Sequence, residues 1–159
     1  MSGFDLDWRE SVGYLLRDAS RLMLRVTAAR LAAHGVTLAQ YFLLRQLWEA
    51  DGRTQREISK ELDVPEPALA ALLRTLEDGG FVRRERSDVD RRRAHVRVTP
   101  EGFAVRDALL AEGTAVVDGM LAGVPDAAVD EFRRTLKQIK ANLLALEGAG
   151  RAARLTNRS

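Results

Sequence analysis

The chain has 159 residues, which suits one domain or one compact lobe with a dimerising extension, since domains commonly hold roughly 100 to 150 residues. It has no cysteine and only two histidines, His34 and His95, so disulfides, thiol catalysis and thiol redox sensing are excluded, and we expect no metal and no cofactor. No apolar run approaches the ~20 residues of a membrane span, and the first residues lack a signal-peptide pattern, so we expect a cytoplasmic protein with no membrane partner.

The first predicted helix begins near Asp7, which with Glu10 resembles a capping pair, and it runs to about Ala33. Its apolar residues are spread too widely for one partner face. We therefore expect this helix to contact both its own lobe and a second partner, and the alternative is a helix that is buried by its own chain alone. Gly35 ends the helix, because glycine readily adopts the left-handed conformation that follows a helix.

Two capping boxes predict the next two helices. Thr37 with Gln40 starts a second helix that runs to Ala50, and Thr54 with Glu57 starts a short third helix. A turn that contains prolines follows, and a fourth helix then places leucines on one stripe before two glycines stop it. The leucines of this stripe are Leu69, Leu72, Leu73 and Leu76.

The segment from Phe81 to Thr99 contains seven arginines and three acids, a net charge of +4, although the whole chain carries only +2. Residues that favour β-strands flank a turn-rich centre, which predicts a two-stranded hairpin with a basic tip. In isolation such a charge run can be merely solvated surface. The order of helix, turn, helix and basic hairpin favours instead a winged helix-turn-helix that faces a polyanion.

Thr99 and Pro100 predict the start of a long fifth helix, in which Gly113 and Gly119 allow a partner backbone to approach closely. Residues 123–125 break the chain. A sixth helix then runs from Asp126 to about Leu146, with apolar residues spaced alternately by three and four positions. We expect the tail, residues 148–159, to be disordered.

From about Ser11 to Leu146 the sequence resembles the MarR family of bacterial transcription regulators. The resemblance is carried by the segments GVTLAQYFLLRQL, TQREISKELDV, LLRTLEDGGFVRR and SDVDRRRAHVRVTPEG. It implies a mostly α fold with a small β-hairpin (α+β), made of a winged helix-turn-helix lobe and a helical dimerisation lobe. Residues 1–36 and 100–147 then supply the dimerisation helices, and residues 37–99 the DNA-binding lobe. It also implies a homodimer on a pseudo-palindromic operator and repression that a small ligand relieves.

By the same resemblance, Arg91 at the wing tip enters a DNA minor groove, with Arg92 or Arg93 on phosphates. A minor groove is narrow and electronegative, so a guanidinium at a hairpin tip can read its width. Acids at this position repel DNA, and Asp88 and Asp90 are therefore expected to brace the arginines or close the turn. The alternative for Asp90 is a turn acid with no special partner.

The fourth helix departs from the family pattern, because its predicted outer face is rich in alanine and poor in hydrogen-bonding groups. Arg74 is its main candidate for reading bases, with Glu66 or Thr75 as minor ones. We therefore expect phosphate contacts, the amides at the helix N-terminus and the wing to carry most of the affinity. The predicted DNA-binding residues are Arg91, Arg92, Arg93, Arg74, Thr75, Pro67, Ala68, Ala71 and Arg84.

The resemblance places an effector near the first, second and fifth helices. Candidates there are Arg17, Arg21, His34, Tyr41 and Phe42. Trp48 and Phe103 fit core packing better, and His34 fits a helix cap better than a ligand contact. The aromatic ring of Phe42 indicates an apolar pocket that accepts an aromatic or phenolic ligand.

Two other functions are alternatives to a ligand-responsive regulator. One is a winged-helix dimer with weak or non-specific DNA binding that acts as a protein-interaction module, because its alanine-rich helix reads few bases. The other is an enzyme, which the sequence disfavours since it offers no nucleophile beside a base, no glycine-rich phosphate loop and no clustered metal ligands.

Overall fold

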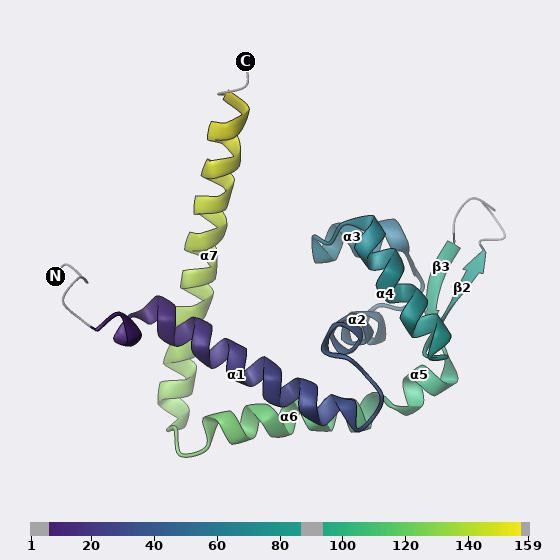
Figure 1. Cartoon of the computed structure of the whole chain (residues 1–159), viewed down its shortest axis with the longest axis horizontal. Helices are drawn as coiled ribbons and strands as arrows, with labels where there is room; N and C mark the ends of the chain where they lie inside the picture. Colours follow the sequence, from purple (N-terminus) through teal and green to yellow (C-terminus); the bar gives the residue numbers. More distant parts are fainter. Residues whose placement is uncertain (1–6, 87–93, 157–159) are drawn as a thin grey trace. The chain divides into compact units, whose positions relative to one another are not determined.

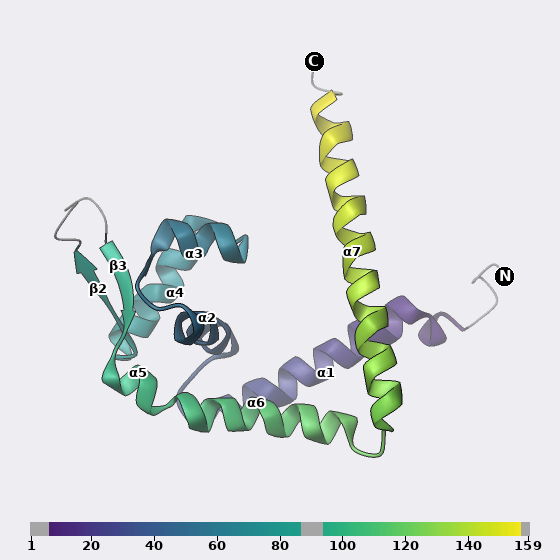
Figure 2. The same cartoon turned by 180° about the vertical axis from the view of Figure 1, so that it is seen from behind.

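The computed structural model describes residues 7–86 and 94–156, and it falls into two compact units, residues 1–117 and 118–159. The described chain is mostly helical with one small sheet, which confirms the predicted fold class (Figures 1 and 2). In chain order the elements are η1 (Trp8–Glu10), α1 (Val12–Ala32), α2 (Leu38–Glu49), β1 (Arg53–Thr54), α3 (Gln55–Leu62), α4 (Glu66–Asp78), β2 (Val82–Arg86), β3 (Ala94–Val98), α5 (Pro100–Ala104), α6 (Arg106–Leu121) and α7 (Asp126–Thr156).

The first long helix, α1, begins later than the sequence predicted. The carboxylate of Asp7 accepts a hydrogen bond from the Arg9 N–H at 3.2 Å and so caps only the short 3₁₀ helix η1. The hydroxyl of Ser11, which accepts from the Tyr14 N–H at 3.3 Å, caps α1 itself. The predicted start at Asp7 is therefore wrong, because the chain makes a separate turn before α1.

Both predicted capping boxes are confirmed. The Gln40 N–H donates to the Thr37 hydroxyl at 3.3 Å, and the Thr37 N–H donates back to the Gln40 side chain at 2.8 Å. Thr54 and Glu57 repeat the same two bonds at 3.3 Å and 2.8 Å at the start of α3. Each pair satisfies two backbone N–H groups that the helix leaves unbonded, which fixes where α2 and α3 begin.

The predicted hairpin is confirmed in its two strands, and it belongs to a three-stranded antiparallel sheet of order β1-β3-β2. Val82 faces Val98 and Arg84 faces Val96 across the β2–β3 pair, while Arg53 of β1 faces Val96 from the other side. The strand β1 has no counterpart among the elements predicted from the sequence. A strand of two residues carries no alternation of polar and apolar side chains from which it can be read.

One hydrophobic core joins α1, α2, α3, α4, the sheet and the first half of α6. It contains the inward leucines predicted for α4 except Leu72, which is only partly buried. Burial of these side chains holds the helix-turn-helix and the hairpin in one lobe. The buried core residues are Leu31, Val36, Tyr41, Leu43, Leu44, Leu47, Ile58, Leu69, Leu73, Leu76, Val82, Val96, Val98 and Leu109.

The predicted long fifth helix is divided into α5 and α6 at Val105. Thr99 caps α5 as expected, since its hydroxyl accepts from the Gly102 N–H at 3.0 Å. The indole N–H of Trp48, however, donates to the Gly102 carbonyl at 3.0 Å. In an uninterrupted helix that carbonyl would accept from the N–H of Arg106. A contact between residues far apart in the sequence therefore marks the place where the helix divides.

Of the two aromatic residues that were predicted to pack in the core, one does so and the other does not. Trp48 is partly buried against the core, as expected, but Phe103 is 41% exposed and lies outside it. Phe103 follows the capped first turn of α5, where Gly102 rather than the phenylalanine faces the hairpin: a Cβ on Gly102 would lie 2.2 Å from the Phe81 carbonyl oxygen. The larger side chain is thus turned outward.

The last helix, α7, continues to Thr156, which corrects the expected end at Leu146 and the expected disorder of residues 148–156. Alanine and arginine dominate this extension, and both are good helix formers that outweigh two glycines. Among the side chains described on α7 none is buried. Four of its apolar residues, Phe132, Leu143, Leu144 and Leu146, are more than half exposed.

Within the described residues no single helix has both the length and the apolar character to cross a bilayer. Only Pro100–Leu121 and Asp126–Ala149, taken together as a bent pair, meet the test by length and composition.

Candidate nucleic-acid interface

A tight turn joins α3 to α4 and fixes the helix-turn-helix. Asp63 ends α3 in the left-handed conformation, with φ of 50°, which aspartate tolerates better than most residues. The Ser59 hydroxyl donates to the Val64 carbonyl at 2.7 Å, and the Val64 N–H donates to the Ser59 carbonyl at 3.1 Å. Gln55 also donates to the Glu66 carbonyl at 3.2 Å. These bonds tie the start of α4 to α3.

The outer face of α4 carries few groups that can read DNA. All the residues predicted to point outward are exposed, while the leucines at positions 69, 73 and 76 are buried. Three acids and one arginine give this helix a formal net charge of −2. The outward residues are Pro67, Ala68, Ala71, Arg74, Thr75 and Asp78. Arg74 is thus the one cation that α4 itself can offer to bases or phosphates.

The hydroxyl of Thr75, a predicted DNA contact, is already engaged. It donates to the Leu72 carbonyl at 2.7 Å and accepts from the side-chain amide of Gln40 at 3.1 Å. A hydroxyl has one donor and two acceptor lone pairs, so one lone pair is left for a base or phosphate. Thr75 therefore links α4 to α2 more than it extends outward.

The N-terminus of α4 presents fewer amides than a typical helix. Pro65 occupies the N-cap position and Pro67 the second helical position, and neither has an N–H group. Of the four N–H groups that helices normally leave free, only those of Glu66 and Ala68 remain. The Glu66 carboxylate lies in the same turn. The expected contribution of these amides to phosphate binding is correspondingly small.

Three arginines on the two wing strands, Arg83, Arg84 and Arg97, are ion-paired. Arg83 pairs with Glu85 at 2.5 Å, and Arg97 lies 3.4 Å from Glu85 as well. Arg84, a predicted DNA contact, pairs at 3.5 Å with Glu77 near the end of α4. Arg84 therefore joins the hairpin to α4, and part of its charge is neutralised within the protein.

The loop after α2 holds the base of the wing. The Asp51 carboxylate accepts from the Val98 N–H at 2.8 Å and pairs with Arg97 at 3.5 Å. The Nδ1 of His95 lies 2.9 Å from the Gly52 carbonyl, which can only accept, so Nδ1 carries the proton. Gly52, with φ of 76°, also leaves room for the Arg97 guanidinium, which would meet a Cβ at 2.3 Å. These contacts fix β3, and with it the direction of the hairpin.

The wing-tip residues lie outside the described part of the chain, which omits 87–93. Arg91, Arg92 and Arg93 as DNA contacts, and Asp88 and Asp90 as bracing acids, therefore stay predictions.

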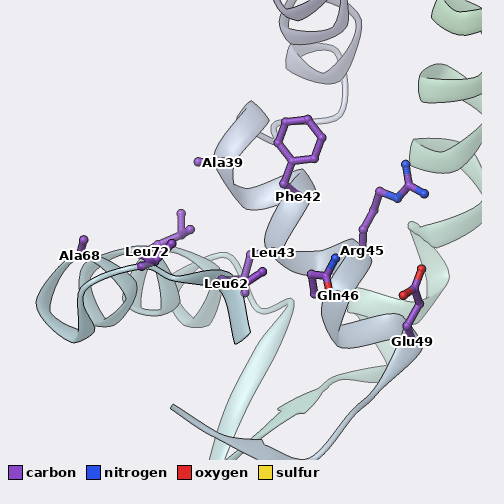
Figure 3. A pocket seen from close by; sticks show the side chains of 10 residues that line it. Ala39, Phe42, Leu43, Arg45, Gln46, Glu49, Leu62, Ala68 and Leu72 are labelled. Atoms are coloured by element: carbon purple, nitrogen blue, oxygen red, sulfur yellow. The ribbon is translucent and has the colours of Figure 1, made fainter. Parts of the chain in front are cut away.

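A hollow with a volume of about 680 Å³ lies between α2, the end of α3 and α4 (Figure 3). Most of its lining is apolar, with polar side chains from the second half of α2. Its lining residues are Ala39, Phe42, Leu43, Arg45, Gln46, Glu49, Leu62, Val64, Ala68 and Leu72. A smaller hollow of about 310 Å³ between α2 and α6 shares Arg45 and Glu49 with it.

The five predicted effector residues have different surroundings, although the rings of Tyr41 and Phe42 lie 5.6 Å apart. Arg17 lies over the Tyr14 ring, with its guanidinium carbon 5.1 Å from the ring centre. Arg21 pairs with Asp18 at 2.6 Å, and this hydrogen bond raises the arginine pKa. Tyr41 is buried in the core. Of the five, Phe42 alone lines the larger hollow.

His34, expected to cap carbonyls, instead faces Glu112 of α6, with its Nε2 3.5 Å from the carboxylate. Arg30 of α1 donates to the same carboxylate at 3.1 Å. The hydrogen bond from Arg30, and then that from His34, hold the pKa of Glu112 below its usual range. The three residues thus join the end of α1 to α6.

Comparison with known proteins finds similarity to regulators of transcription. A family model described as the MarR family matches residues 34–93. The chain is similar to the organic hydroperoxide resistance transcriptional regulator of Bacillus subtilis, with 29% identity over 133 residues that cover 84% of each chain. It is also similar to an HTH-type transcriptional repressor of Mycobacterium bovis, with 29% identity over 128 residues, 80% of this chain and 92% of the relative.

Among solved structures, the chain resembles CouR from Rhodococcus jostii RHA1 bound to p-coumaroyl-CoA. The TM-score is 0.70 at 28% identity, and the match covers 82% of this chain and 92% of that one. The relatives are thus regulators of transcription, and the likeness extends across both units.

Proposed function

Because this chain belongs to the MarR family of winged helix-turn-helix transcriptional regulators, we propose that it is a cytoplasmic homodimeric repressor whose operator binding is relieved by a small aromatic or phenolic ligand. The observation that carries the proposal is the single core that holds α3, α4 and the basic hairpin in one lobe. In a dimer, two α4 helices enter successive major grooves of a pseudo-palindromic operator about 34 Å apart. No catalytic step is part of this function.

The wing is proposed to supply a large share of the affinity. Support comes from α4, which has a net charge of −2, an alanine-rich face and two free N-terminal amides. Arg91 is proposed to enter the minor groove, and Arg92 and Arg93 to contact phosphates. Arg56 and Lys60, exposed on α3, are further candidates for phosphate contacts.

The dimer is proposed to form through α1, α6 and α7. The described parts of these helices expose apolar side chains that their own chain leaves uncovered, and water disfavours such surfaces. On α7 the apolar residues are spaced by three and four, as in helices that pair along a seam. They are Val129, Phe132, Leu136, Ile139, Leu143 and Leu146.

Control by a bound ligand, rather than by oxidation, is proposed for two reasons. The 159 residues contain no cysteine, so they hold no thiol with which to sense an oxidant. The Rhodococcus relative was solved with p-coumaroyl-CoA, a molecule with a phenolic ring. A ligand can release DNA only if it binds the DNA-free conformation more tightly.

The experiment that tests the function is a binding titration of wild type and Arg91→Ala with the upstream DNA of the gene, at several salt concentrations. We expect Arg91→Ala to weaken binding by about tenfold and to lower the salt slope by about 1, as for the loss of one cation at the DNA. Lys137→Ala, which removes an exposed cation from the polar face of α7, is the matched control. Unchanged affinity and slope for Arg91→Ala would show that the wing does not bind DNA.

The alternative function is a winged-helix dimer that binds DNA weakly or without specificity and serves as a protein-interaction module. The same alanine-rich face of α4 favours this alternative. The two functions differ in their preference for sequence. A scrambled duplex of the same length serves as competitor. If the upstream and scrambled duplexes bind equally at two salt concentrations, the alternative is supported, because a repressor needs a large specificity ratio.

A further inference from the structure

Gln40 of α2 is one of two polar side chains that are buried in the described part of the chain, with 8% of it exposed. The other is Thr27, whose hydroxyl donates to the Met23 carbonyl within the same helix at 2.8 Å. The amide of Gln40, by contrast, bonds at both ends to residues that lie outside α2. A buried polar group is costly unless it is hydrogen-bonded, so Gln40 holds its two partners in place.

The bonds of Gln40 form a relay from the start of α2 to α4. The Thr37 N–H donates to the side-chain oxygen of Gln40 at 2.8 Å, and the side-chain nitrogen of Gln40 donates to the Thr75 hydroxyl at 3.1 Å. This hydroxyl donates in turn to the Leu72 carbonyl at 2.7 Å. A backbone N–H can only donate and a carbonyl can only accept, so each bond of the relay has one possible direction. Removal of the Gln40 amide or the Thr75 hydroxyl therefore breaks the relay.

The first member of the relay is anchored to the end of α1. The Val36 N–H donates to the Leu31 carbonyl at 3.3 Å, and both of these side chains are buried. The next residue, Thr37, carries the N–H with which the relay begins. A continuous set of bonds thus leads from α1, a helix of the proposed dimer, through α2 to α4, which lies beside α2 (Figures 1 and 2).

We propose that Gln40 is a positioning residue for DNA recognition, which sets the place of α4 through Thr75 without touching DNA itself. This role rests on the proposed function, in which two α4 helices meet major grooves about 34 Å apart. Burial of leucines holds α4 in the lobe, but apolar contacts have no preferred direction. The directional bonds from Gln40 supply the orientation that base contacts need.

Binding titrations of the full chain test this role, with the upstream duplex and a scrambled duplex of the same length. The variants are Gln40→Met and Thr75→Val, which remove the hydrogen bonds with little change in side-chain shape. We expect each to weaken binding to the upstream duplex by about tenfold, the size of one lost base contact. Binding to the scrambled duplex and the salt slope should stay as in wild type, because neither change removes a cation that contacts phosphate.

The double variant separates the relay from a direct contact between Thr75 and DNA. If both residues act through one relay, the double variant loses about tenfold, as each single variant does, rather than about a hundredfold. If Thr75 contacts a base by itself, Gln40→Met binds the upstream duplex like wild type, and the role of Gln40 is overturned. Thr27→Val removes the other buried polar group and is the matched control, which should bind both duplexes like wild type.

Urea denaturation of wild type, the two single variants and the double variant shows whether the relay exists without DNA. Destabilisations that do not add support the link between Gln40 and Thr75, and additive ones overturn it. If wild type prefers the upstream duplex and both single variants keep that preference, the proposed function stands and the role of Gln40 is wrong. If the two residues are coupled but wild type prefers neither duplex, the proposed function fails, and the DNA role of Gln40 fails with it.

Discussion

The phenolic oxygen of Tyr41 on α2 lies against Gly113 on α6, so closely that a Cβ on the glycine would be 2.2 Å from it. Tyr41 is 2% exposed and belongs to the core, so its ring has little freedom to move away. From the sequence, Gly113 was predicted to allow a partner backbone to approach closely. The structure places there a side chain of the same chain, which fixes the distance between α2 and α6.

Replacing Gly113 with alanine should destabilise the protein. The added methyl overpacks the contact with Tyr41, which typically costs about 1–3 kcal/mol, while alanine returns about 1 kcal/mol of helix propensity. We therefore expect a net loss of up to about 2 kcal/mol in the free energy of unfolding. Urea denaturation followed by circular dichroism measures it.

Two further variants isolate the cause. Gly119→Ala lies in the same helix with nothing within 4 Å of its added Cβ, and it should gain stability, by up to about 1 kcal/mol. Tyr41→Phe combined with Gly113→Ala removes the clashing oxygen and should recover most of the loss. If Gly113→Ala alone is as stable as Gly119→Ala, the packing of Tyr41 on α6 is not as described.

The sequence predicted those parts of the fold that depend on neighbouring residues. The capping boxes at Thr37 and Thr54 lie within four residues, and both were placed correctly. The division of α5 from α6 was missed because it coincides with a hydrogen bond from Trp48 to Gly102, 54 residues apart. Contacts at that separation leave no periodic signal in a sequence.

The cluster at Glu112 predicts a pH dependence. The pKa of Glu112 is lowered in the folded state, chiefly by the hydrogen bond from Arg30. The ionised carboxylate therefore stabilises the folded protein at pH values above the unfolded carboxyl pKa, about 4.3. This stabilisation is lost as the pH falls through the pKa of the folded state. The Glu112→Gln variant lacks this pH-dependent stabilisation. The difference in unfolding free energy between wild type and Glu112→Gln should therefore be greatest near neutral pH and shrink in acid.

Urea denaturation at pH 7, 5, 4 and 3 measures that difference. Adding Arg30→Gln to Glu112→Gln should cost little more, because the partner is already gone. A difference that stays constant down to pH 3 would show that the ion pair is not formed in solution.

The apolar stripe of α7 predicts that the dimer depends on Leu143, whose side chain is 57% exposed in the single chain. A charge at a buried interface is costly, so Leu143→Glu should shift the protein toward monomer and weaken operator binding through the loss of the second lobe. Analytical ultracentrifugation measures the first effect. Lys137→Glu, on the polar face of α7, should remain dimeric, and a monomer from both variants would mean that the stripe is not the interface.

The DNA-binding site was only partly predictable. The order of elements revealed the lobe, and the alanine-rich face of α4 is exposed as expected. Which arginines are free could not be read from the sequence, because the partner of Arg84 is Glu77 on another element. Phe42 drew attention to an apolar pocket. Its neighbours across the hollow, Ala68 and Leu72, looked in the sequence like part of a DNA-reading helix and its core.

The ion pair between Arg84 and Glu77 gives the last prediction, that Glu77→Gln strengthens DNA binding. The change removes one of three acids from α4 and frees the Arg84 guanidinium, which is 35% exposed, for a phosphate. We expect higher affinity at low salt and a salt slope steeper by about 1, the mark of one additional phosphate contact. Asp118→Asn removes the same charge from an exposed position on α6 and serves as the control. If both variants raise affinity equally, net charge alone explains the effect. If Glu77→Gln weakens binding, the pair is needed to hold the hairpin against α4, and Arg84 acts by positioning the wing.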